Sequence, residues 1–100
     1  MTLDIKIDGN NVIGTLAGRL DTAAATQFSQ DMQPLVDNAE KQIVLDCNDL
    51  EFISSSGLRL LLTLRKATMA KGGKVLLRGV RPEIKQVFTI TGFSSLFDFE

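Results

Sequence analysis

Residues 42–59, QIVLDCNDLEFISSSGLR, decide the fold class of this chain. The continuous run Ile43-Val44-Leu45 is typical of a buried strand that is covered on both faces. After it, Ser54-Ser55-Ser56-Gly57 lies directly before leucines at helical spacing, which predicts a helix from Ser55 to Lys71. A buried strand followed at once by an amphipathic helix indicates an α/β protein.

Further strands are predicted on both sides of this unit. Residues 3–8 alternate between apolar and polar side chains, which predicts a strand with one wet face. Gly9-Asn10-Asn11 provides turn residues, so residues 12–18 should form the returning strand of a hairpin. Towards the C-terminus, Gly72-Gly73 ends the long helix, and residues 74–78 predict another short buried strand.

Two more helices complete the pattern. Asp21 is a suitable N-cap, and apolar side chains recur at helical spacing from residue 24 to residue 39. Pro34 lies inside this pattern and should kink or end the helix, because proline has no N–H to donate. A third helix begins at Pro82 and ends at Gly92, and residues 96–100 predict a last edge strand.

The predicted order is therefore β-β-α-β-α-β-α with a last short strand. We expect a single domain over residues 1–100 with an α/β fold, in which an opening β-hairpin joins a mixed, mostly parallel sheet of four or five strands covered by at least three helices. In such a sheet the loops that follow parallel strands gather at one edge. Arg19-Leu20-Asp21 and residues 52–57 should therefore lie close together.

The composition argues for a binding protein. Histidine is absent, so the commonest general base and metal ligand is missing. The single cysteine, Cys47, is expected to be a buried packing residue in a reducing cytoplasm. A net charge of −1 gives no electrostatic support for nucleic-acid binding, and Leu60-Leu61-Leu62 is too short an apolar run for a membrane span. We expect a cytoplasmic protein that is not an enzyme and needs neither a metal nor a cofactor.

The serine cluster allows two interpretations. Ser54 or Ser55 could cap the helix by accepting a hydrogen bond from a first-turn amide, which stabilises a helix by about 1 kcal/mol. One cap accounts for one serine only. On a helical wheel one arc holds the polar and small residues Ser55, Ser56, Arg59, Thr63, Lys66 and Ala70, and the rest of the wheel holds Leu58, Leu60, Leu61 and Leu64, with Leu62 and Met69 at the border.

The wheel predicts that the Ser55 hydroxyl points outward at the start of a polar stripe, although an ordinary solvated helix face would give the same stripe. The chain has no histidine to activate this hydroxyl as a nucleophile, so Ser55 is better suited to accept a phosphoryl group from another protein. The amides and dipole at the helix start would stabilise the phosphate, and Arg59 could reach it. About −1.5 to −2 charges would then interrupt a contact surface.

The stretch Asp46-x-x-x-Leu50-x-Phe52-Ile53-Ser54-Ser55-Ser56-Gly57-Leu58-Arg59 resembles the signature of bacterial STAS-domain anti-sigma factor antagonists. Gly18-Arg19-Leu20-Asp21, Gly72-Gly73 and the segment from Pro82 through Phe88 to Gly92 agree in order and spacing, so the resemblance extends over the whole chain. One position differs, because many members have Asp where this chain has Ser54, and this lowers the local negative charge.

The resemblance implies that the unphosphorylated chain binds an anti-sigma factor that is also a serine kinase, which releases the sigma factor. In that family phosphorylation of the residue that corresponds to Ser55 ends the binding, and a metal-dependent serine phosphatase removes the phosphate. Ser56 and Gly57 match interface positions of the family, and Asp21 matches the acidic residue in the adjacent loop. The candidate partner-binding residues are these three with Ser54, Leu58, Arg59, Leu62 and Thr63. We expect the free protein to be a monomer, with no nucleic-acid or membrane partner.

Two other functions stay open at this point. STAS-like domains also serve as constitutive accessory subunits of bacterial lipid-transport ATPase complexes, and full function of a Ser55→Asp variant would favour that role. A weak nucleotide hydrolase is the third hypothesis. Its weakness is that Lys71-Gly72-Gly73-Lys74 lacks the spacing of a phosphate-binding loop and is explained by a plain helix-to-strand turn.

Overall fold

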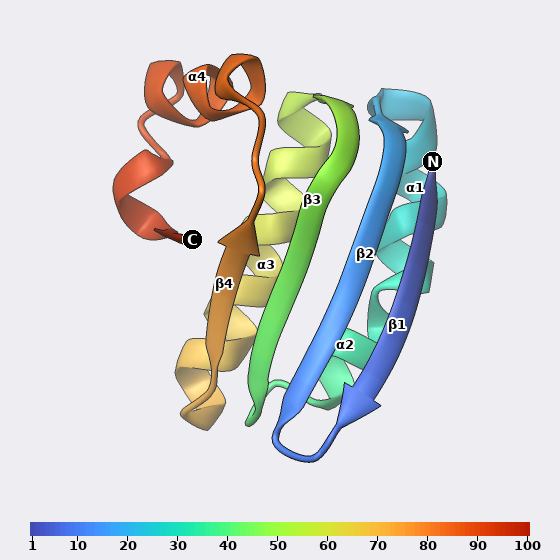
Figure 1. The fold of residues 1–100 in the computed structure, drawn as a ribbon, viewed down its shortest axis with the longest axis vertical. Helices are drawn as coiled ribbons and strands as arrows, with labels where there is room; N and C mark the ends of the chain where they lie inside the picture. Colours follow the sequence, from blue (N-terminus) through green and yellow to red (C-terminus); the bar gives the residue numbers. More distant parts are fainter.

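The computed structural model describes residues 1–100 and shows an α/β fold with one five-stranded sheet (Figure 1). Along the chain the elements are β1 (Thr2–Asp8), β2 (Asn11–Leu20), α1 (Thr22–Asp31), α2 (Gln33–Asp37), β3 (Gln42–Ile53), α3 (Ser55–Lys71), β4 (Lys74–Arg78), α4 (Pro82–Ile90), the 3-10 helix η1 (Ser94–Leu96) and β5 (Asp98–Phe99). The strands lie side by side in chain order. β1 is antiparallel to β2 and the other neighbours are parallel, so the predicted mixed sheet and opening hairpin are confirmed.

Helices α1, α2 and α3 lie together behind the sheet, and α4 lies at its upper end beside β4 (Figure 1). Alternate residues of the strands point into the layer between sheet and helices. Val12 and Leu16 of β2 pack there with Ile43 and Leu45 of β3 and with buried leucines of α3 such as Leu61. No helix of the chain has both the length and the hydropathy that crossing a membrane requires.

The prediction that β3 is covered on both faces is wrong, because the three packed helices lie on one face only (Figure 1). Val44 points to the open face and is outside the main core cluster, although only 4% of it is exposed. It lies between Ile13 and Leu76 on the two neighbouring strands. A central strand is thus shielded by its neighbours, which is why its sequence resembles that of a doubly covered strand.

The predicted break at Pro34 is confirmed. α1 ends at Asp31, and α2 begins at Gln33 with the proline in its first turn. A first turn tolerates proline because its N–H groups have no partner inside the helix. The break does not interrupt the apolar pattern, since Met32 and Leu35 on either side of it are both buried.

The lengths of two strands differ from the prediction. β3 continues to Ile53, well beyond the predicted end near Cys47, and β5 contains only two residues of the predicted segment 96–100. Two register shifts, each with one extra residue in β3, keep β2 and β3 paired up to the Leu20–Ile53 pair. As a result both strands end at the same edge of the sheet, next to the start of α3.

Candidate functional site

The ends of β2 and β3 are joined to each other directly before their helices begin. Leu20 pairs with Ile53, and the Ser54 amide donates a hydrogen bond of 2.8 Å to the Leu20 carbonyl. Asp21 and Ser54 are therefore the residues that immediately follow two adjacent parallel strands. This confirms the expectation that the two segments meet at one edge.

Both residues cap a helix. An Asp21 carboxylate oxygen accepts a hydrogen bond of 2.8 Å from the Ala24 amide at the start of α1. The Ser54 hydroxyl accepts one of 3.1 Å from the Gly57 amide at the start of α3. The structure thus assigns the cap of α3 to Ser54 and leaves the side chain of Ser55 free of this role.

Ser55 is the first residue of α3 and is exposed, whereas Ser54 and Ser56 are half-buried. Helix geometry leaves the Ser55 and Ser56 amides without a carbonyl partner inside the helix, because Leu58 is the first residue to donate back, to the Ser54 carbonyl at 3.0 Å. The helix dipole adds partial positive charge at the same point. An anion on the Ser55 side chain would therefore lie in a favourable field.

The polar stripe predicted for α3 is confirmed. Its residues Ser55, Arg59, Thr63, Lys66 and Ala70 are exposed and Ser56 is half-buried, while Leu58, Leu61 and Leu64 are buried against the sheet. Leu60, which was predicted to face the sheet, is half-buried but packs against the core. The stripe is a continuous surface one helix long that begins at the serine cluster.

Other candidate residues have little exposed surface. Leu58 is fully buried, and Leu62 is half-buried against the core. Gly57 is also buried, and a methyl group built on it would lie 2.7 Å from Cγ of Leu20. Only glycine lets α3 approach β2 this closely. Gly57 and Leu58 are therefore not surface residues themselves, but their packing fixes the positions of Ser55 and Arg59.

A shallow groove of about 400 Å³ lies between α1 and α3 beside this stripe. Ser56, Arg59 and Leu60 line it from α3, and Thr22, Ala25, Thr26 and Ser29 line it from α1. Four of these seven residues carry a hydroxyl group, and one is an arginine. Thr63, one turn beyond Arg59, donates its hydroxyl to the Arg59 carbonyl at 3.0 Å.

Arg19 and Phe52 form a surface pair to which the sequence alone assigns no role. Register pairs the two residues across β2 and β3, and the guanidinium carbon lies 4.4 Å from the ring centroid. Phe52 is 37% exposed, so the pair presents a cation and an aromatic face to solvent. The signal in the sequence was an aromatic next to the buried Ile53 at the end of β3.

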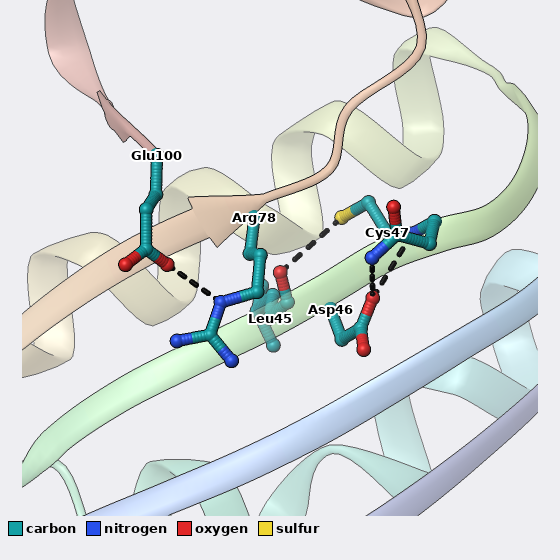
Figure 2. Close-up of polar contacts among 6 residues, drawn as sticks. Leu45, Asp46, Cys47, Arg78 and Glu100 are labelled. Atoms are coloured by element: carbon teal, nitrogen blue, oxygen red, sulfur yellow. Dashed lines mark hydrogen bonds and ion pairs between the residues drawn. The ribbon is translucent and has the colours of Figure 1, made fainter.

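The charged groups near the serine cluster are free of ion pairs. The one ion pair of the chain joins Arg78 of β4 to the C-terminal residue Glu100 at 2.6 Å, and this hydrogen bond raises the pKa of Arg78 (Figure 2). Arg19 and Arg59 therefore remain available for contacts with a partner or with an anion.

Cys47 is buried, as predicted, and is chemically protected. Figure 2 shows its thiol directed to the Leu45 carbonyl, at a distance of 3.6 Å. Burial, with a smaller contribution from the charge of Asp46, raises the pKa of the thiol to about 12. A thiol with so little thiolate is a packing group and not a nucleophile.

The chain is a small α/β protein with a serine cluster at the start of α3, and comparison with known proteins identifies its family. The family model for the STAS domain matches residues 2–100. The chain belongs to the STAS domain family.

Two similar proteins are named as anti-sigma factor antagonists. BtrV of Bordetella bronchiseptica, which is provisionally named an anti-sigma factor antagonist, is 38% identical over 97 residues, covering 97% of this chain and 82% of the relative. The anti-sigma-B factor antagonist of Bacillus subtilis is 25% identical over 99 residues, covering 98% of this chain and 89% of the relative.

Solved structures share the fold at lower identity. The anti-sigma factor antagonist SpoIIAA in its unphosphorylated form has a TM-score of 0.79 at 21% identity and covers 99% of this chain and 88% of its own. The Bacillus SpoIIAA structure in the phosphorylated form has a TM-score of 0.73 at 22% identity, with 99% of this chain and 91% of its own chain covered.

Proposed function

We propose that this chain is an anti-sigma factor antagonist that is switched off by phosphorylation of Ser55. The unphosphorylated form binds an anti-sigma factor that is a serine kinase, and the binding releases a sigma factor. The kinase phosphorylates Ser55 and the complex separates. A metal-dependent serine phosphatase restores the binding form, and the cycle takes place in the cytoplasm.

The observation that carries the proposal is the position of the Ser55 hydroxyl. It is exposed at the first residue of α3, and the cap of that helix is made by Ser54 instead. A kinase needs a hydroxyl that it can reach and that the fold does not require. Ser54 is less suitable, since the residue is half-buried and its hydroxyl is needed to accept the hydrogen bond from the Gly57 amide.

The charge of a phosphate explains a switch without unfolding. A phosphoserine adds about −1.5 to −2 charges at neutral pH, and at a helix start these are stabilised by amides and the dipole. Arg59, one turn along and in no ion pair, supplies a further cation. The domain therefore keeps its fold, while a surface that was nearly neutral at Ser55 becomes strongly anionic and repels a partner that fits the unmodified form.

The contact surface that we propose surrounds this hydroxyl. Its exposed members are Arg59 and Thr63 on α3, and its half-buried members are Asp21, Ser54, Ser56 and Leu62. Gly57 and Leu58 are buried, and their packing against the sheet holds these residues in place. The surface is continuous with the groove between α1 and α3, so a partner can contact both helices at once.

The relatives support the proposal. The chain resembles proteins named as antagonists of anti-sigma factors over nearly its whole length, and one structural neighbour, SpoIIAA, is known in both phosphorylated and unphosphorylated forms. These are findings about those proteins, and the agreement in fold makes the same cycle the best hypothesis for this chain.

The test compares binding and modification in four variants. Wild type, Ser55→Ala, Ser55→Asp and Ser56→Ala are used as bait in native lysate, and the captured kinase is identified by mass spectrometry and then purified. We expect wild type and Ser55→Ala to retain the kinase and Ser55→Asp to lose it, while Ser56→Ala serves to show which serine is modified. With ATP and the purified kinase, one phosphate should appear on wild type and on Ser56→Ala, and none on Ser55→Ala. Phosphate on Ser55→Ala, or undiminished binding of Ser55→Asp, would refute the switch.

A further inference from the structure

The outer edge of β1 is free. The sheet order places β1 at one end, where β2 is its single strand neighbour (Figure 1). The strand has seven residues and no proline. Its unpaired N–H and C=O groups form a template for another strand. The opposite edge strand, β5, has two residues and offers no comparable template.

The side chains of β1 alternate between two kinds of environment. Leu3, Ile5 and Ile7 point to the helix side, where Leu3 and Ile5 pack against the core and are half-buried. Ile7 is 54% exposed, which is unusual for a residue on this side of the sheet. Asp4 and Lys6 are exposed and point to the open face.

We propose that a second copy of this chain pairs with β1, antiparallel and about a two-fold axis at Ile5. In this register Asp4 lies opposite Lys6 of the partner subunit, and Lys6 opposite the partner's Asp4. Leu3 lies opposite the partner's Ile7, and Ile5 opposite the partner's Ile5. All seven residues of the strand are paired, and the two sheets become one continuous sheet with both helix layers on the same side.

The charges select this register among those that symmetry allows. If the register shifts by one residue, apolar side chains of one copy lie opposite charged side chains of the other, and the two apolar faces no longer lie on the same side of the joined sheet. The next symmetric registers are centred on Asp4 or on Lys6, and each places a charged side chain opposite its own copy. Directly opposite like charges destabilise a strand pair, and opposite charges stabilise it. A register centred on Ile7 would also pair opposite charges, Lys6 with the partner's Asp8, but only residues 6–8 of the two strands would then overlap. The register centred on Ile5 is the one that pairs opposite charges twice along the full strand.

The apolar side adds to the pairing. The partner's Leu3 would cover Ile7, which the fold leaves half uncovered. The two Ile5 side chains would meet on the axis, next to Gly14 of β2, which lacks a side chain of its own. The contact is narrow, so the dimer should be weak and should depend on concentration.

The pairing leaves the proposed switch untouched. The axis lies at the middle of β1, whereas Ser55 follows the end of β3, the third strand of the sheet. Each subunit therefore presents its own Ser55 surface, and the dimer does not depend on phosphorylation. A failure of either proposal leaves the other in place.

Charge exchange on exposed residues gives a test that does not threaten the fold. Sedimentation equilibrium from micromolar to millimolar concentration should show a monomer–dimer equilibrium for wild type. Lys6→Asp places a carboxylate opposite the partner's Asp4 at both symmetric positions and should weaken association about tenfold. The double variant D4K/K6D restores opposite charges and should recover wild-type association. Lys74→Asp, the same change of charge at an exposed position on β4, is the matched control and should have no effect.

A disulfide tests the register directly. Opposite residues of an antiparallel pair have Cα atoms about 4.5–5.5 Å apart, within the range that a disulfide spans. Ile5→Cys should therefore form a covalent dimer on mild oxidation, and Lys6→Cys should do so much more slowly, because its own copy is not opposite. Cys47 gives little background because it is buried.

A monomer at every concentration, which the sequence alone leads us to expect, would overturn the proposal. So would a dimer that Lys6→Asp leaves unchanged, or cross-linking of Lys6→Cys as fast as that of Ile5→Cys.

Discussion

Ser54 and Ser55 are neighbours with the same side chain, and the structure predicts that removing their hydroxyl groups has different effects on stability. The Ser54 hydroxyl accepts the hydrogen bond from the Gly57 amide, 3.1 Å away, at the start of a helix of 17 residues. The Ser55 hydroxyl is exposed and takes no part in this cap. Ser54→Ala should destabilise the domain, and Ser55→Ala should not.

The size of the effect follows from the cap. Loss of an N-cap serine costs about 1 kcal/mol of the free energy of unfolding, within a range of about 0.5–2 kcal/mol. For a domain of this size, that corresponds to a melting temperature lower by about 4–8 °C. Alanine at an exposed helical position such as Ser55 should change the free energy of unfolding by less than about 0.5 kcal/mol.

Urea denaturation followed by circular dichroism measures the difference. Ser54→Ala should lower the urea midpoint without changing the slope of the transition, since the surface exposed on unfolding is the same. Ser54→Asp is the matched control, because aspartate caps a helix as well as serine does and also favours the dipole. Equal destabilisation by Ser54→Ala and Ser55→Ala, or a neutral Ser54→Ala, would refute the assignment of the cap.

Three further predictions concern the glycine turn, the core and the thiol. Gly73→Ala should lower the free energy of unfolding by about 3 kcal/mol, because a methyl group there would overlap the backbone carbonyl oxygen of Ala39. Gly72→Ala has open space around the methyl group and should lower it by about 1 kcal/mol, because Gly72 has a left-handed backbone. Chemical denaturation of both variants measures the difference. Phe88→Ala removes a ring that makes two edge-on aromatic contacts at 5.5 Å and should lower the free energy of unfolding by about 3–5 kcal/mol. Cys47 should react with a thiol reagent far more slowly in the native protein than in denaturant, and equal rates would show that it is not buried. Because folding raises the pKa of this thiol from 9.0 to about 12, its contribution to stability is fully present below pH 9 and should be lost as the pH rises towards 12.

Local sequence patterns predicted most of the elements. The hairpin, the break at Pro34, the long helix from Ser55 to Lys71 and the helix from Pro82 were all expected from spacing, capping residues and proline. These signals act within one or two turns or across one hairpin. They need no knowledge of the rest of the chain.

The predictions from the sequence were wrong where contacts between segments far apart in the chain decide the structure. The apolar run Ile43-Val44-Leu45 suggested helices on both faces of β3, but Val44 is buried by the flanking strands β2 and β4. The end of β3 was placed too early, because its pairing with β2 continues through two register shifts that the sequence does not reveal. The stacked pair of Arg19 and Phe52 depends on the same register.

The sequence by itself determined the α/β class, the order of the elements and the outward position of Ser55 on its helix, because helical and strand periodicity are properties of neighbouring residues. Tertiary structure alone decided which serine caps α3, which face of the sheet stays open and which residues meet at the ends of β2 and β3. These depend on strand register and on the close approach of α3 to Leu20 at Gly57, which are contacts between segments far apart in the chain.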